Sequence, residues 1–141
     1  MKAFHASSVI AATPEQVWAV LVDGRHWTDW DSAVVRFDGT IAAGQKVTVR
    51  PEVNPGRAFP VTVVEFDPGK RMVWRGGMPL GLFTGTRTYT LAGQPDGMVR
   101  FDMEEHYSGP LATLITKSIP DLTDSFTRFA NGLKQRVEST R

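Results

Sequence analysis

Apolar residues follow one period through most of this sequence and another period at its end, and this change limits the folds open to the chain. From residue 33 to residue 107, short segments rich in β-branched and aromatic residues alternate with turn-forming sequences such as DPGK at 67–70. After Pro110, apolar residues recur every three or four positions as far as Val137, which is the spacing of a helix with one apolar face. A series of strands followed by an amphipathic helix is therefore expected.

The first 32 residues predict a strand and two short helical segments. Residues 3–11 are small or β-compatible and predict the strand. The sequence TPEQ at 13–16 is a capping box with proline at the first helical position, so a helix is expected from there to about Val22. A second helical turn is expected over residues 26–30 (HWTDW).

The rest of the chain predicts the sheet and the helix that covers it. Six further strands are expected, at 33–37, 45–50, 61–66, 71–75, 83–91 and 98–107. Because Pro120 lacks a backbone donor, the terminal pattern should divide into a short helix at 110–118 and a long one at 121–138. Only this long helix has enough apolar surface to cover a sheet. The expected fold is α+β: a curved antiparallel sheet of about seven strands wrapped around a long C-terminal helix, with two short helices after the first strand.

Composition excludes several classes of protein. The 141 residues suit one domain spanning 1–141, and a formal net charge of +1 without a basic tail gives no reason to expect a nucleic-acid partner. There is no cysteine and the three histidines are far apart, so neither a metal site nor a cofactor is expected. No run reaches the ~18 apolar residues of a membrane helix, and the first residues lack the apolar stretch of a signal peptide. No stable membrane insertion and a cytoplasmic location are expected.

One carboxylate stands on the apolar face of the last predicted strand. Glu105 alternates in phase with Phe101 and Met103, and an unpaired carboxylate is costly to bury. Arg87 stands on the apolar face of the preceding strand, in phase with Tyr89. If the two strands form a hairpin, Arg87 and Glu105 form a cross-strand ion pair. The pair either closes the sheet as a structural ion pair or lines a partly wet cavity and orients a polar group of a ligand.

Four stretches carry a resemblance that extends over essentially the whole chain. They are ATPEQVWAVLVDGRHWTDWD (12–31), PGKRMVWRGG (68–77), GLFTGTRTYTL (81–91) and RFDMEEHYSGPL (100–111). In this order they resemble the helix-grip fold of the START-like (SRPBCC) superfamily and, within it, the polyketide cyclase/dehydrase and lipid-transport group. The resemblance implies a cavity between sheet and long helix that holds a small hydrophobic or amphipathic ligand, which is lipid-, polyketide- or isoprenoid-like. We expect a monomer or a homodimer.

The residues expected to line this cavity come from the inner face of the sheet, from the short helical turn and from the long helix. They are Trp27, Trp30, Met72, Trp74, Phe83, Arg87, Tyr89, Phe101, Met103, Glu105, Tyr107, Leu122, Phe126 and Phe129. An alternative function is a cyclase or dehydratase, for which Glu105, Arg87 and Tyr107 are the catalytic candidates. A third alternative is a protein-interaction module, like the chaperone activators of the superfamily.

Two predictions leave their alternatives open. Trp27 and Trp30 form either a lid over the cavity mouth or an aromatic anchor for the short helical turn. The glycine-rich segment 76–83 is either a gating loop beside the cavity or an ordinary wide turn. An interaction module would use either this segment or the outer face of the sheet as its contact surface.

Overall fold

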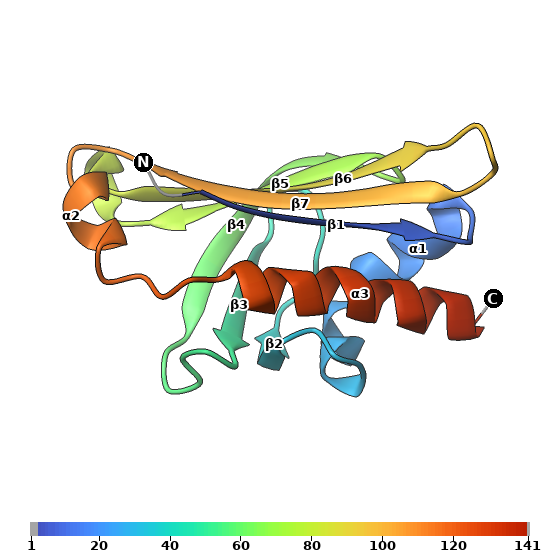
Figure 1. Cartoon of the computed structure of the whole chain (residues 1–141). Helices are drawn as coiled ribbons and strands as arrows, with labels where there is room; N and C mark the ends of the chain where they lie inside the picture. The colour runs from blue at the N-terminus through green and yellow to red at the C-terminus, as the bar shows by residue number, and fades with distance from the viewer. Residues whose placement is uncertain (1–2, 141) are drawn as a thin grey trace.

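The computed structural model of the chain describes residues 3–140, and these form a curved sheet with helices on its concave side (Figure 1). Each strand is antiparallel to its neighbours, and the order across the sheet is β1-β7-β6-β5-β4-β3-β2. The strands are β1 (Ala3–Ile10), β2 (Val34–Asp38), β3 (Lys46–Pro51), β4 (Phe59–Asp67), β5 (Arg71–Gly77), β6 (Thr84–Gly93) and β7 (Val99–Ser108).

The helices lie where the sequence predicts them, with one addition. They are α1 (Pro14–Leu21), the 3₁₀ helices η1 (Gly24–Asp29) and η2 (Pro79–Gly81), α2 (Ala112–Thr116) and α3 (Thr123–Thr140). Only η2 was not expected, and the ends of the expected elements differ from those observed by no more than two residues. One difference has a clear cause: β2 begins at Val34 because Ala33 has a φ of +60°, outside the strand region. The predicted α+β helix-grip architecture is confirmed.

The capping box at the start of α1 forms as the sequence predicts. The Thr13 hydroxyl oxygen accepts from the Gln16 amide at 3.2 Å, and the Gln16 side-chain oxygen accepts from the Thr13 amide at 2.9 Å. These two bonds satisfy backbone donors that have no partner within the helix. They fix the point at which the chain leaves β1 and turns beneath the sheet.

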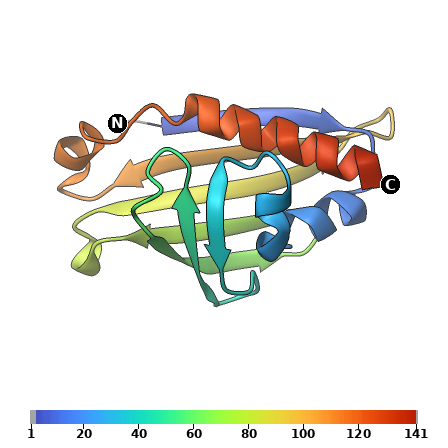
Figure 2. The same ribbon diagram turned by 90° about the horizontal axis from the view of Figure 1, so that it is seen from below.

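Helix α3 crosses the concave side of the sheet alongside β1 (Figure 2). Its apolar stripe is buried, with Phe126, Phe129 and Leu133 among the side chains that face the sheet. Two polar contacts hold its other edge: the Ser8 hydroxyl donates to the Ala130 carbonyl at 2.8 Å, and Lys134 donates to the Val9 carbonyl at 2.7 Å. The helix therefore fixes the edge strand β1 as well as covering the core.

The centre of the core is a group of aromatic rings from the sheet, η1 and α3. Trp27 stacks on Trp74 with ring centroids 5.7 Å apart, and it meets the Phe129 ring edge-on at 4.9 Å. Tyr89 contacts both Trp74 and Phe129. The Trp27 indole N–H donates to the Leu21 carbonyl at 3.0 Å, so this large buried side chain leaves no polar group unsatisfied.

Candidate functional site

The predicted Arg87–Glu105 ion pair is confirmed. The hairpin of β6 and β7 places the two residues directly opposite each other, and the Arg87 Nε atom lies 2.9 Å from Glu105 Oε1. Their side chains are 23% and 15% exposed, so the pair is largely buried but still reached by water. It lies on the concave face, on the same side of the sheet as the aromatic core.

Tyrosine and phenylalanine side chains complete this polar group. The Tyr107 hydroxyl donates to Glu105 Oε2 at 2.6 Å, and Arg87 Nη1 donates to the Tyr89 hydroxyl at 3.4 Å. The Arg87 guanidinium also lies over the Phe126 ring, 4.7 Å from its centroid, which is cation–π geometry. The three catalytic candidates, Arg87, Glu105 and Tyr107, are thus brought together, and both oxygens of the carboxylate accept a hydrogen bond.

The surroundings keep Arg87 charged and the tyrosines protonated. Burial alone would lower the pKa of Arg87, but the nearby Glu105 carboxylate and the Tyr89 hydroxyl raise it above its usual value. Burial raises the pKa of Tyr107, and the adjacent Glu105 raises it further. Burial also raises the pKa of Tyr89, although Arg87 opposes this. The group therefore presents one cation and two neutral hydroxyls at neutral pH.

We refer to this group as the polar end of the interior; it consists of Phe83, Arg87, Glu105, Tyr107, Leu122 and Phe126. Phe83 stacks on Tyr107 with centroids 5.6 Å apart and an interplanar angle of 14°. Leu122 begins the approach to α3, where its carbonyl accepts from the Phe126 amide at 2.9 Å. Both Phe83 and Leu122 are only partly buried. This end can therefore offer an ion pair, hydroxyl groups and partly open apolar surface to one molecule.

The other predicted lining residues lie deeper. Those that are buried in the aromatic core are Trp27, Met72, Trp74, Tyr89, Phe101, Met103 and Phe129, while Trp30 is partly buried against Phe129. Trp27 is fully buried and hydrogen-bonded to Leu21 at the end of α1, which is the geometry of an anchor for η1. That these deeper residues contact a ligand remains a prediction.

One residue that contacts the polar end was missed by the sequence reasoning. The Phe4 ring of β1 lies 6.4 Å from the Tyr107 ring and 6.1 Å from the Phe126 ring, measured between ring centroids. Phe4 stands opposite Glu105 in the β1–β7 pairing. The alternation of Phe4 and Ala6 with polar residues was the available signal, but it does not say which strand β1 will pair with.

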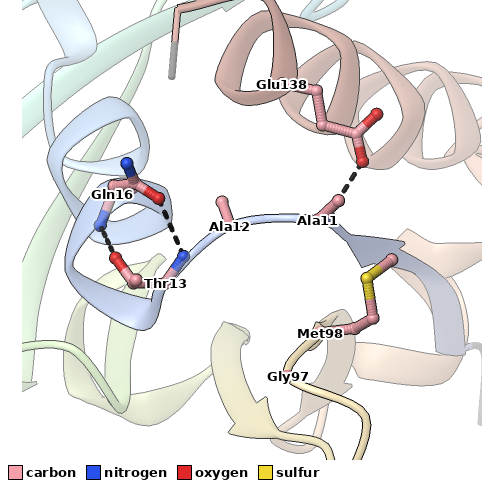
Figure 3. Close-up of a pocket in the computed structure, with 7 residues that line it drawn as sticks. All are labelled: Ala11, Ala12, Thr13, Gln16, Gly97, Met98 and Glu138. Carbon is pink, nitrogen blue, oxygen red and sulfur yellow. Dashed lines mark hydrogen bonds between the residues drawn. The ribbon is translucent and has the colours of Figure 1, made fainter.

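A surface depression lies at the opposite end of the strands (Figure 3). It has a volume of about 640 Å³ and is lined by Ala11, Ala12, Thr13, Gln16, Gly97, Met98 and Glu138. The Glu138 carboxylate accepts from the Ala11 amide at 2.8 Å, and Thr13 and Gln16 are joined by the capping box (Figure 3). Its polar groups thus stabilise local structure, and none of the predicted lining residues belongs to it.

Residues 3–140 contain neither a metal-binding cluster nor a membrane-spanning helix. Within this range there is no cluster of three or more histidine, aspartate or glutamate side chains placed to hold a metal ion. None of the helices in the same range is both long enough and apolar enough to cross a membrane.

Comparisons with known proteins place the chain among relatives of the same fold. The sequence profile of the family described as polyketide cyclase/dehydrase and lipid transport matches residues 1–138. No curated protein matches the sequence.

Among solved structures, a hypothetical protein from Helicobacter pylori has a TM-score of 0.77 at 17% identity, with 96% of this chain and 88% of that one covered. A START superfamily protein from Mycobacterium smegmatis has a TM-score of 0.70 at 10% identity, with 99% of both chains covered. DynU16, described as a protein in the dynemicin biosynthetic locus, has a TM-score of 0.70 at 16% identity. The match covers 100% of this chain and 49% of DynU16. At these identities the likeness shows the fold alone.

Proposed function

Because the chain belongs to the polyketide cyclase/dehydrase and lipid-transport family, we propose that it binds one small amphipathic molecule at the polar end of its interior. The ligand is lipid-, polyketide- or isoprenoid-like. Its polar group lies against Arg87, Glu105 and Tyr107, and its apolar part lies against Phe83, Leu122 and Phe126. The cytoplasmic location predicted from the sequence is part of this proposal.

The observation that carries the proposal is a charged, hydrogen-bonded group set among aromatic rings and still reached by water. A buried ion pair with a purely structural role adds little to the stability of a fold, because the cost of desolvating the two charges offsets their attraction. Here the Arg87 and Glu105 side chains are 23% and 15% exposed to solvent. Both lie on the concave face of the sheet rather than on its outer face. Binding sites combine an apolar wall with a few fixed polar groups in this way.

The partly buried residues indicate how far the ligand extends. Phe83 and Leu122 belong to the polar end and are only partly buried. Deeper between sheet and α3, the Trp27 ring contacts the rings of Trp74 and Phe129. A short ligand is held by the first group, and a longer one reaches the second group only when those rings move.

A cyclase or dehydratase is the alternative, and one observation favours it: Arg87, Glu105 and Tyr107 form a continuous hydrogen-bonded group. A general acid or base works best with a pKa near the operating pH. Burial and Glu105 raise the pKa of Tyr107 further from neutrality, and the pKa of Arg87 is raised despite its burial. Neither side chain is therefore ready to exchange a proton at neutral pH, and binding is the better supported function.

The test begins with native mass spectrometry of protein purified from its source, in which a retained molecule is identified unchanged. Affinity for that molecule is then compared for Arg87→Met and Glu105→Gln. Each variant leaves one charge of the pair unmatched, so affinity is expected to fall about tenfold or more, equivalent to ~1.4 kcal/mol. Arg100→Met is the matched control, because Arg100 is paired with Asp102 on the outer face and should leave affinity unchanged.

Thermal unfolding of each variant separates lost binding from lost structure. If Arg87→Met and Glu105→Gln remain folded and bind as tightly as the unaltered protein, the polar end is not the ligand site. Conversion of the retained molecule to a new product would favour the enzyme.

A further inference from the structure

One end of the molecule exposes apolar side chains on two neighbouring turns. Leu80 of η2 is 96% exposed and Leu114 of α2 is 67% exposed. Met78 and Leu82, on either side of η2, are also exposed. Both views place the η2 turn and α2 at the same end of the sheet (Figures 1 and 2). We call Met78, Leu80, Leu82 and Leu114 the apolar tip.

The two turns are fastened to each other through their backbones. The Leu111 amide donates to the Leu82 carbonyl at 2.9 Å. Gly109 has a φ of +102°, and a Cβ added to it would lie 2.6 Å from the Gly81 carbonyl oxygen, so only glycine permits this approach. The apolar tip is therefore carried by one connected unit.

Leu80 has a backbone conformation that leucine adopts rarely. Its φ is +61°, in the left-handed region that glycine and asparagine occupy more easily. A leucine that is almost fully exposed buries little apolar surface in the folded chain. It therefore adds little to folding, and its apolar surface is available to a partner.

The two segments that carry the apolar tip contain basic but no acidic side chains, and Glu104 and Glu105 directly precede the second of them. Residues 75–86 and 106–120 contain no aspartate or glutamate, and apart from the buried Tyr107 their titratable side chains are Arg75, His106 and Lys117. Arg75 and His106 both stand opposite Thr86 in the sheet and are exposed. The nearest acid that follows along the chain, Asp121, accepts from the Thr123 amide at the start of α3.

We propose that the apolar tip docks reversibly on an anionic lipid surface, which goes beyond the ligand binding proposed above. Four separate apolar side chains on two convex turns can enter the interfacial region of a bilayer, and the basic groups behind them then face the lipid phosphates. A stable protein interface buries roughly 800 Å² on each partner, more than these four partly exposed side chains supply. Leu82 precedes Phe83, so docking brings the polar end close to the lipid.

The experiment is co-sedimentation of the full chain with vesicles at low ionic strength. One set of vesicles is phosphatidylcholine alone and the other contains phosphatidylglycerol as well. Binding to the anionic vesicles is expected, and it should weaken as salt is added. Leu80→Asn and Leu114→Gln should each weaken partitioning by about tenfold, the loss expected when one leucine no longer enters the bilayer. Lys117→Gln should weaken binding to the anionic vesicles only.

Each substitution suits its backbone, so folding is retained and can be checked by circular dichroism. Asparagine tolerates the positive φ at position 80, and glutamine is a good helix former at position 114. Val35→Thr on β2 is the matched control, since Val35 is exposed but lies on the edge strand β2, away from the two turns of the apolar tip. Its partitioning should equal that of the unaltered protein.

Three outcomes overturn the proposal. One is the absence of binding to either vesicle, and another is binding that the double variant Leu80→Asn/Leu114→Gln leaves unchanged. The third is a dimer in analytical ultracentrifugation that Leu80→Asn dissociates, because the occupant of the apolar tip is then a second copy of the chain.

Discussion

The two tyrosines of the chain both have their hydroxyl groups in the interior, within one hydrogen-bonded group. The folded protein holds their protons more tightly than an unfolded chain would, because burial raises the pKa of Tyr89 and of Tyr107. Glu105 raises the pKa of Tyr107 further, since a tyrosinate beside a carboxylate is unfavourable.

This difference predicts how stability depends on pH. The unfolded-state pKa of tyrosine is about 10, so the stability contributed by the two protonated hydroxyls is fully present below that pH and is lost as pH rises above it. The folded protein should show no tyrosinate absorbance at 295 nm at about pH 11, whereas urea-unfolded protein should titrate near pH 10. Tyrosinate absorbance should appear only together with the loss of circular dichroism.

Tyr107→Phe provides the control, because it removes one of the two titrating groups and leaves Tyr89 in place. The fall in stability above about pH 10 should become shallower in this variant. A tyrosinate signal with an ordinary midpoint in protein that is still folded would contradict the described hydrogen bonds.

At the scale of elements, a glycine of α3 allows a neighbouring segment to approach the helix closely. A Cβ added at Gly132 would overlap the Asp31 carbonyl oxygen and lie 3.0 Å from the Trp30 ring. The segment that links η1 to β2 thus lies directly against the helix. Arg128 strengthens the same contact through ion pairs of 2.6 Å to Asp31 and 2.9 Å to Glu52.

Gly132→Ala is expected to destabilise the protein by about 2 kcal/mol, because the clash displaces the linking segment from α3. This is the reverse of the usual effect in a helix, where alanine is favoured over glycine by about 1 kcal/mol. Asn131→Ala, one position away on the exposed side, should be neutral or slightly stabilising. Urea unfolding of both variants measures the contrast, and equal stabilities for the two would refute the close contact.

What could be predicted from the sequence depended on how near the partners lie in the chain. The Arg87–Glu105 pair could be predicted because β6 and β7 form a hairpin, and its short turn and alternation set the register. The capping box of α1 is likewise local. The contacts of Phe4 with Tyr107 and of Arg128 with Asp31 join distant segments, and no local pattern specifies which ones meet. The hydrogen bond that the Trp27 indole donates was missed for a different reason. Its acceptor is a backbone carbonyl, which every residue carries, so no side-chain pattern marks the partner.

At the scale of the whole molecule, Trp27 of η1 contacts four other elements. Its ring touches Phe37 of β2, Trp74 of β5 and Phe129 of α3, and its N–H bonds to the end of α1. The half of the sheet that contains β2 is therefore joined to the rest of the core through Trp27, through the contact of Phe37 with Trp74, and through strand pairing.

Trp27→Phe should lower the free energy of unfolding by about 2–3 kcal/mol, since it leaves a cavity and an unsatisfied carbonyl at Leu21. Trp30→Phe is the same chemical change at a partly buried position and should cost about 1 kcal/mol. Unfolding followed by circular dichroism in urea measures both. Equal losses would show that Trp27 is not the central contact.

The place of β1 in the sheet has a consequence for how the protein is made. β1 pairs with β7, so that Ala3 lies opposite His106, and α3 then packs along β1. A ribosome that adds ~5–20 residues per second needs roughly 5–20 s to make the partner strand after it has made β1. Throughout that time the emerging chain carries an unpaired strand with an apolar face, and its native partners do not yet exist. The sheet can therefore be completed only after β7 has been made, and pairing between strands so far apart in the chain slows folding.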